Sequence, residues 1–131
     1  MNLLLIIAAL IEALAGLALL LIPTVAVSTL LGASLDTATG LAVSRIAGAA
    51  LIALAIACWQ AKNERGNSAI GVVEAMSFYN FAAAMVLVYA GIRLDLRSAL
   101  IWPVIVFHLG LGAWCVFTLW SARKISRSEM T

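Results

Sequence analysis

The sequence predicts an all-α integral membrane protein, a bundle of four transmembrane helices in up-down-up-down order. Of its 131 residues, 65% are hydrophobic and only 11% are charged, whereas a soluble domain carries about 45–50% apolar and about 25% charged residues. Four apolar segments also reach the ~20 residues that a helix needs to cross a bilayer. A core of this size cannot hide so much apolar surface, so the surplus is expected to face lipid in a single domain over 1–131.

Breaks in the apolar pattern separate the four expected spans. Pro23 ends the first span because it has no amide to continue the helix. The segment 24–31 is apolar but too short to span, and we expect it to form a turn or two at the membrane surface. Asp36 or Thr37 is suited to cap the second helix. The expected spans are 2–22, 38–60, 68–91 and 99–120, followed by a polar tail at 121–131 that is expected to fray.

Small residues recur along the second span. Gly40, Ser44 and Gly48 stand four residues apart, a spacing that lets another helix approach closely. In the fourth span, Pro103 falls within the first turn, where a missing amide is tolerated.

The distribution of basic residues predicts the orientation. The loop after the second span and the C-terminal tail share the side of the N-terminus, and this side carries five basic residues against two on the other. They are Lys62, Arg65, Arg123, Lys124 and Arg127, against Arg93 and Arg97. By the positive-inside rule, we expect both termini in the cytoplasm, with the chain in the bacterial inner (plasma) membrane.

The first segment also has a signal-peptide-like feature. Ala13-Leu14-Ala15 before Gly16 resembles a cleavage site. Met1 and Asn2 provide no basic region, however, and Glu12 interrupts the apolar stretch. We expect the segment to be retained as the first span.

Each expected span contains one ionisable residue: Glu12, Arg45, Glu74 and His108. With a rise of ~1.5 Å per residue, Glu12 and His108 lie ~15 Å deep, and Arg45 and Glu74 ~10 Å deep. Such residues are costly in a membrane and usually mark functional sites. Asn80 falls near the midplane, and its neighbour Tyr79 adds a hydroxyl.

These depths predict a polar layer in which Glu12, Asn80 and His108 share one level, with Arg45 reaching Glu12 as an ion pair. A structural interpretation stands beside it. Arg45 can extend to the membrane surface, Glu74 can find water, and His108 can simply join two helices by a hydrogen bond. The candidates for binding a ligand or proton are Glu12, Arg45, Glu74, Tyr79, Asn80 and His108.

Several chemistries lack their sequence signals. There is no phosphate-binding loop, Cys-x-x-Cys pair, zinc-protease motif or hydrolase elbow, so we expect no cofactor and no metal, and an enzyme is the less favoured class. Cys58 and Cys115 lie in apolar segments without a disulfide or metal spacing, and we interpret them as buried thiols. A net charge of +2 with dispersed charges disfavours nucleic acid as a partner.

Two resemblances bear on these hypotheses. The runs Glu12-Ala13-Leu14-Ala15-Gly16-Leu17 and Ser44-Arg45-Ile46-Ala47-Gly48 resemble small uncharacterised bacterial four-helix membrane proteins, broadly the DoxX-like group, which implies a fold and little about function. The mid-span Glu12 and the run Gly91-Ile92-Arg93-Leu94-Asp95-Leu96 resemble small multidrug resistance transporters. The third span lacks the glycine-rich kink of that family, and Arg45 and Glu74 add charges foreign to it.

Three functions therefore remain open besides a least favoured redox role. The chain binds or transports a small molecule or ion at Glu12, Arg45 and His108; or it is an accessory or assembly subunit of a larger membrane complex; or it is a proton-coupled exporter of the multidrug type. Four helices leave little room for a sealed cavity. Besides the lipid bilayer, we therefore expect a partner, either a second copy of the chain or a larger membrane protein.

Overall fold

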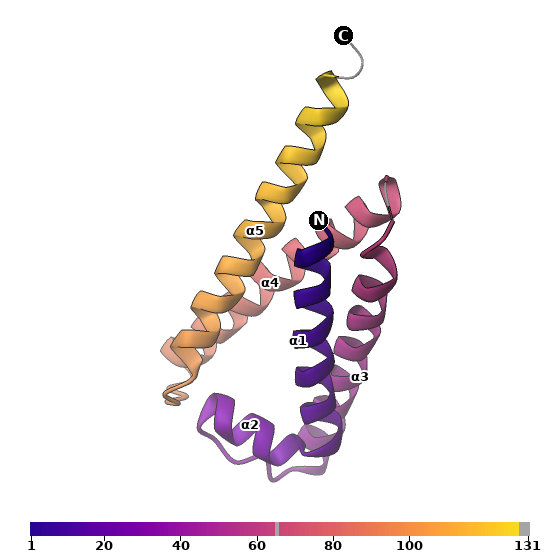
Figure 1. Cartoon of the computed structure of the whole chain (residues 1–131). Coiled ribbons are helices and arrows are strands. Elements are labelled where there is room, and N and C mark those ends of the chain that lie inside the picture. Colours follow the sequence, from indigo (N-terminus) through magenta and orange to yellow (C-terminus); the bar gives the residue numbers. More distant parts are fainter. Residues whose placement is uncertain (65, 129–131) are drawn as a thin grey trace.

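The computed structural model describes residues 1–64 and 66–128, with side chains as far as Lys124. The described residues form five helices and no strand (Figure 1). They are α1 (Asn2–Leu21), α2 (Pro23–Leu31), α3 (Ala38–Ala61), α4 (Asn67–Arg93) and α5 (Ile101–Ser128). Four of them, α1, α3, α4 and α5, are long and apolar enough to cross a membrane. The prediction of an all-helical, multi-pass membrane protein with four spans is confirmed.

The short α2 is the apolar segment that the sequence left between the first two spans. Helix α1 ends at Leu21, and Pro23 occupies the first turn of α2, where a missing amide costs no hydrogen bond. The left-handed φ of 71° at Gly32 ends the helix, a conformation that glycine adopts without strain. In Figure 1, α2 runs across the ends of the long helices and bridges the space between them.

The long helices are arranged as two pairs, α1 with α3 and α4 with α5. In the first pair, α1 and α3 meet at Gly16 and Gly48. A Cβ atom on Gly16 would lie 2.8 Å from the carbonyl oxygen of Gly48, and one on Gly48 would lie 2.7 Å from that of Gly16. The predicted close approach at the second span is therefore made by α1, backbone against backbone.

The second pair is held differently. The ring of Phe81 on α4 covers Gly112 on α5, and a Cβ atom there would lie 3.0 Å from the ring. This contact is between a side chain and a backbone, so a rotation of the ring can relax it.

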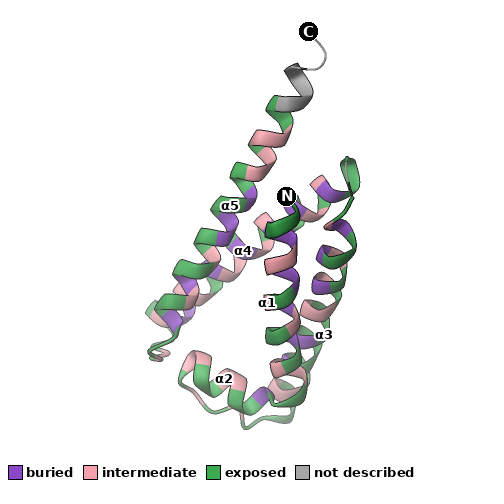
Figure 2. Cartoon of the chain, in the orientation of Figure 1, coloured by how far each residue is buried: buried purple, intermediate pink, exposed green. Residues whose placement is uncertain are grey.

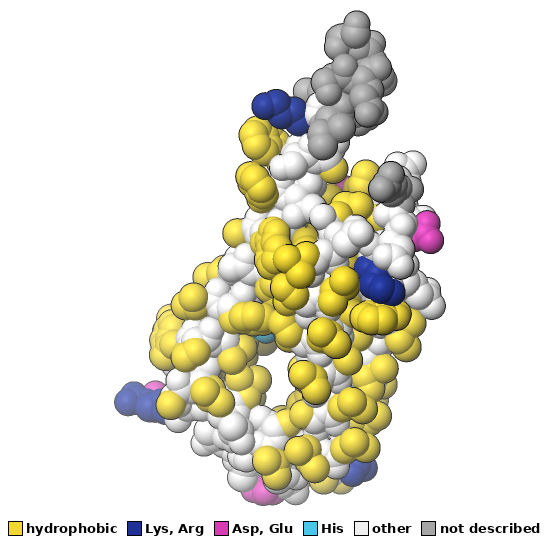
Figure 3. Space-filling model, in the orientation of Figure 1, with side chains coloured by type: hydrophobic (Ala, Val, Ile, Leu, Met, Phe, Trp, Pro, Cys, Tyr) yellow, Lys and Arg dark blue, Asp and Glu magenta, His cyan; other side chains and the backbone are white. Residues whose placement is uncertain are grey.

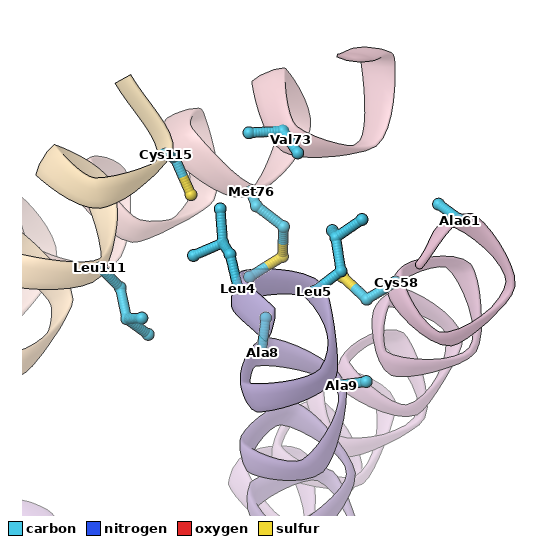
Figure 4. Packing of buried hydrophobic residues seen from close by; sticks show 10 residues of the cluster. All are labelled: Leu4, Leu5, Ala8, Ala9, Cys58, Ala61, Val73, Met76, Leu111 and Cys115. Atoms are coloured by element: carbon cyan, nitrogen blue, oxygen red, sulfur yellow. The ribbon is translucent and has the colours of Figure 1, made fainter. Parts of the chain in front are cut away.

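The two pairs are joined at both ends. At the end where α1 begins, a buried apolar cluster connects all four long helices (Figure 4). At the other end, the Ser98 hydroxyl before α5 donates a 2.6 Å hydrogen bond to the Thr29 carbonyl of α2, and Leu31 packs against a second apolar cluster around Ile101. The first cluster consists of Leu4, Leu5, Ala8, Ala9, Cys58, Ala61, Val73, Met76, Leu111 and Cys115.

The element bounds agree with the predicted spans except at the C-terminus. The expectation that the chain frays after Trp120 is wrong as far as Ser128, because α5 continues to that residue; 129–131 lie outside the described residues. Arg123 forms a 2.9 Å ion pair with Glu74 of α4, and Lys124 lies 5.7 Å from the Trp120 ring centre. Both contacts lie in the first turn of the added segment 121–128.

The outer surface is the apolar one. Figure 2 shows buried positions on the facing sides of the long helices and exposed positions on their outer sides. The exposed residues include many large hydrophobic ones, such as Leu14, Phe78 and Met85. In water this pattern would be unfavourable, and it is the pattern expected of helices that face lipid.

Candidate functional site

The candidate site lies where α1 faces the α4–α5 pair. Glu12 follows Ala8 by one turn on the inward side of α1 and is only 2% exposed. Ala8 and Ala9, about one turn earlier on that helix, belong to the buried apolar cluster. Across the bundle, Tyr79 on α4 lies close to this carboxyl group.

Tyr79 lies between the buried carboxyl group of Glu12 and His108, the chain's single histidine. The rings of Tyr79 and His108 meet edge to face, with their centres 5.8 Å apart. His108 lies on α5 and is half-buried, as is Tyr79. Side chains from three helices therefore lie next to one another inside an apolar bundle.

Asn80 completes the group and fixes the histidine ring. Its Nδ2 donates a 2.8 Å hydrogen bond to the Met76 carbonyl, one turn earlier on α4. Its Oδ1 therefore faces His108 and lies 2.9 Å from Nδ1. Because an amide oxygen can only accept, Nδ1 must carry the hydrogen. In the neutral ring, Nε2 is then left as an acceptor.

The Asn80–His108 contact was expected from depth alone, and the direct hydrogen bond confirms that these residues share a level. Glu12 reaches the same layer through Tyr79, a residue whose position in the sequence gave no specific partner. We name Glu12, Tyr79, Asn80 and His108 the polar cluster.

The expected ion pair between Glu12 and Arg45 is wrong. Helices α1 and α3 are antiparallel and cross at Gly16 and Gly48, so Glu12 lies on one side of the crossing and Arg45 on the other. The two residues are about 10 Å apart along the helix axes at ~1.5 Å per residue. Arg45 is exposed and belongs to the outer surface of α3.

Glu74 also lies away from the polar cluster. It is exposed on α4 and pairs with Arg123 at 2.9 Å, near the end of the bundle where α1 begins. Within the described residues, the other ion pair joins Asp95 to Arg97 in the α4–α5 loop. No described lysine or arginine forms an ion pair with Glu12.

Two further groups have no assigned role. Cys58 and Cys115 are free thiols in the cluster beside the polar residues, as expected of buried thiols. Ser44, 7% exposed on α3, is the one buried hydroxyl of the described chain without a hydrogen-bond partner. Its small size suits the packing of α3, and nothing else in the structure points to it.

The polar cluster borders an opening in the molecule. Figure 3 shows a passage through the space-filling surface, between α1 and the α4–α5 pair and above α2, with the histidine colour at its edge. The sequence carries no signal for this opening, because the opening depends on how far the two helix pairs diverge.

The cluster can hold and pass hydrogen bonds and protons. It combines a carboxyl group, a phenol, an imidazole and an amide, and each can donate or accept in some protonation state. Among the described residues, no three histidine, cysteine, aspartate or glutamate side chains gather as metal ligands. The chain matches no known family model, and neither curated proteins nor solved structures give a significant match.

Proposed function

We propose that this chain is a protein of the bacterial inner membrane, with both termini in the cytoplasm, that binds or transports a small molecule or ion at the polar cluster. The observation that carries the proposal is Glu12. Its side chain is 2% exposed in a membrane span, and no described cation pairs with it. An intramembrane carboxyl group of this kind is costly and is retained where function needs it.

The geometry supports a specific division of roles. Glu12 is the group that takes up or releases a proton or a bound cation. Tyr79 lies close to Glu12 and meets the ring of His108 edge to face, so it connects the buried carboxyl group with the half-buried ring by packing. Histidine is the side chain best suited to exchange a proton near neutral pH. Asn80 positions the ring through Nδ1.

Arg45 and Glu74, which belonged to the expected site, are outside this proposal. Both are exposed and away from the polar cluster. The small-residue stripe of α3, which could have served to dock a larger complex, is occupied at Gly48 by α1 of the same chain. Self-association remains part of the proposal, since one chain does not seal the opening.

The test uses proton movement into vesicles that contain the purified protein and a trapped pH-sensitive dye. An imposed pH gradient is expected to collapse faster with the native chain than in empty vesicles. Glu12→Gln is expected to abolish the difference, because the amide cannot exchange a proton. Glu74→Gln is the matched control, because the same change is made at an exposed position. This variant is expected to collapse the pH gradient as fast as the native chain.

Thermal unfolding and gel filtration of each variant establish that it is folded. A folded Glu12→Gln protein that moves protons as fast as the native chain would contradict the proposed role of Glu12. Capture of a stoichiometric membrane partner, together with no proton movement by the native chain, would favour the accessory-subunit function instead.

A further inference from the structure

The opening beside the polar cluster is bounded on every side by packed elements. The α1–α3 pair forms one wall and the α4–α5 pair the other, and each pair has a close contact at a glycine. The apolar cluster around Leu4 and Met76 closes one end. The hydrogen bond from Ser98 to Thr29 and the packing of Leu31 close the other. The opening is therefore part of the fold.

The walls of this opening are apolar. In Figure 3, hydrophobic side chains line its two sides, white atoms border it below, and neither charge colour borders it in this view. The charged residues that the structure describes are at the ends or on the outside of the bundle, apart from the buried Glu12. Because the long helices cross the membrane, the opening faces the lipid interior. Its occupant must be mostly apolar.

One hydrogen-bonding position at the edge of the opening is unused. His108 uses Nδ1 for the contact with Asn80, and Nε2 forms no hydrogen bond with another described residue. In the neutral ring this nitrogen accepts. A ligand that donates a hydrogen bond would satisfy it, whereas a carboxylate would meet a second acceptor and a quaternary ammonium would offer no donor.

From the apolar walls and the free acceptor together, we infer that the site takes a lipid-like amphiphile whose uncharged head group donates a hydrogen bond to His108 Nε2. The apolar body lies in the opening between the helix pairs, and entry is sideways from the bilayer. This inference rests on the proposed binding function and names its ligand class.

The ligand class is tested with three photoactivatable probes that share one sixteen-carbon chain with a diazirine at the same carbon. One ends in a hydroxyl group, one in a carboxylate and one in a trimethylammonium group. Each is added at low mole fraction to the protein in phosphatidylcholine nanodiscs, and labelled peptides are mapped. We expect the alcohol to label α1, α4 and α5 about tenfold more than the other probes, as one added hydrogen bond can provide.

Variants and a second measurement make the test specific. His108→Leu is expected to remove the preference for the alcohol, whereas the control Tyr89→Phe, at an exposed tyrosine of α4, is expected to keep it. Because the chain has one histidine, ¹⁵N-histidine labelling reports on His108 alone in the native protein. The Nε2 resonance is expected to shift on addition of the alcohol and to stay unchanged with the carboxylate. This readout stands even if His108→Leu does not fold.

The possible results separate the inference from the function on which it rests. Preference for the carboxylate or the ammonium probe, lost in Glu12→Gln, overturns the ligand class and leaves the proposed function standing. Equal labelling by all three probes that is unaffected by His108→Leu means that bulk lipid fills the opening, and crosslinks between two copies mean that another chain does. Either result overturns the inference. If proton movement also fails to depend on Glu12, the proposed function falls with it.

Discussion

The two helix pairs of this bundle are built on different contacts. In α1–α3, two glycines bring the backbones together. A Cβ atom on either glycine would lie within 2.8 Å of the carbonyl oxygen of the other. In α4–α5, a phenyl ring covers Gly112, and the pair is joined by a hydrogen bond between Asn80 and His108. The first pair is a fixed wall. The second carries the polar side chains, and its contacts can readjust.

The difference explains where the candidate site lies. Glu12 is on the fixed pair, and Tyr79 of the other pair lies close to its carboxyl group. The hydrogen-bonding partners are all on α4 and α5. The polar cluster therefore exists only where the pairs meet, and a small movement between them changes it while each pair stays intact.

The largest expected effect comes from breaking the fixed pair. Gly48→Ala places a methyl group 2.7 Å from the Gly16 carbonyl oxygen, and neither backbone can rotate away, so the helices must separate. We expect a loss of about 1–3 kcal/mol in the free energy of unfolding, measured in detergent. Gly71→Ala, with nothing within 4 Å, is the control and is expected to leave stability unchanged or raised, because alanine favours helix. Equal effects at both positions would mean that the close backbone contact at Gly48 does not fix the α1–α3 pair.

A smaller loss is expected when the hydrogen bond of the second pair is removed. Asn80→Ala deletes the partner of His108 Nδ1 and one bond to the Met76 carbonyl. Measured couplings between polar groups in membrane helices average about 0.6 kcal/mol and reach about 1.7 kcal/mol. A cycle with Asn80→Ala, His108→Leu and the double variant is expected to give a coupling in this range. A coupling of zero would mean that the two side chains do not stabilise each other.

Gly112 of the second pair should tolerate substitution better than Gly48 of the first. Gly112→Ala meets the Phe81 ring at 3.0 Å, and Phe81 is 37% exposed, so it has room to turn. We expect a cost below about 1 kcal/mol, because the conflict is with a movable side chain. Adding Phe81→Leu to this variant should recover part of the lost stability. A cost as large as that of Gly48→Ala would show that the α4–α5 pair is equally rigid.

The smallest effect is expected at the bridge between the pairs. Ser98→Ala removes the 2.6 Å hydrogen bond to Thr29, an exposed contact that we expect to contribute about 0.5 kcal/mol. Its consequence should be local: faster hydrogen exchange in α2 with little change in overall stability. Ser28→Ala, which removes a hydroxyl bonded within α2 itself, is the control. Equal exchange in the two variants would mean that Ser98 does not hold α2 against the second pair.

Several features of the fold followed directly from the chain. Pro23, the polar loop before Asn67 and the turn before Ile101 divide the apolar sequence into spans whose ends agree with the structure within two residues, the extended C-terminal helix excepted. Thr37 caps α3 by accepting a 3.0 Å hydrogen bond from the Gly40 amide, as its position predicted. These features depend on local hydropathy and local hydrogen bonds, which neighbouring residues decide.

The sequence by itself also determined the depth of each polar residue, since depth follows from a constant rise along a helix, and Asn80 and His108 do meet. Only the tertiary structure decided which side chains face each other. The register of α1 on α3 at Gly16 and Gly48 moves Arg45 away from Glu12, and the approach of α4 brings Tyr79 to it. Rotation about a helix axis and divergence between pairs depend on contacts far apart in the chain, and no single span encodes them.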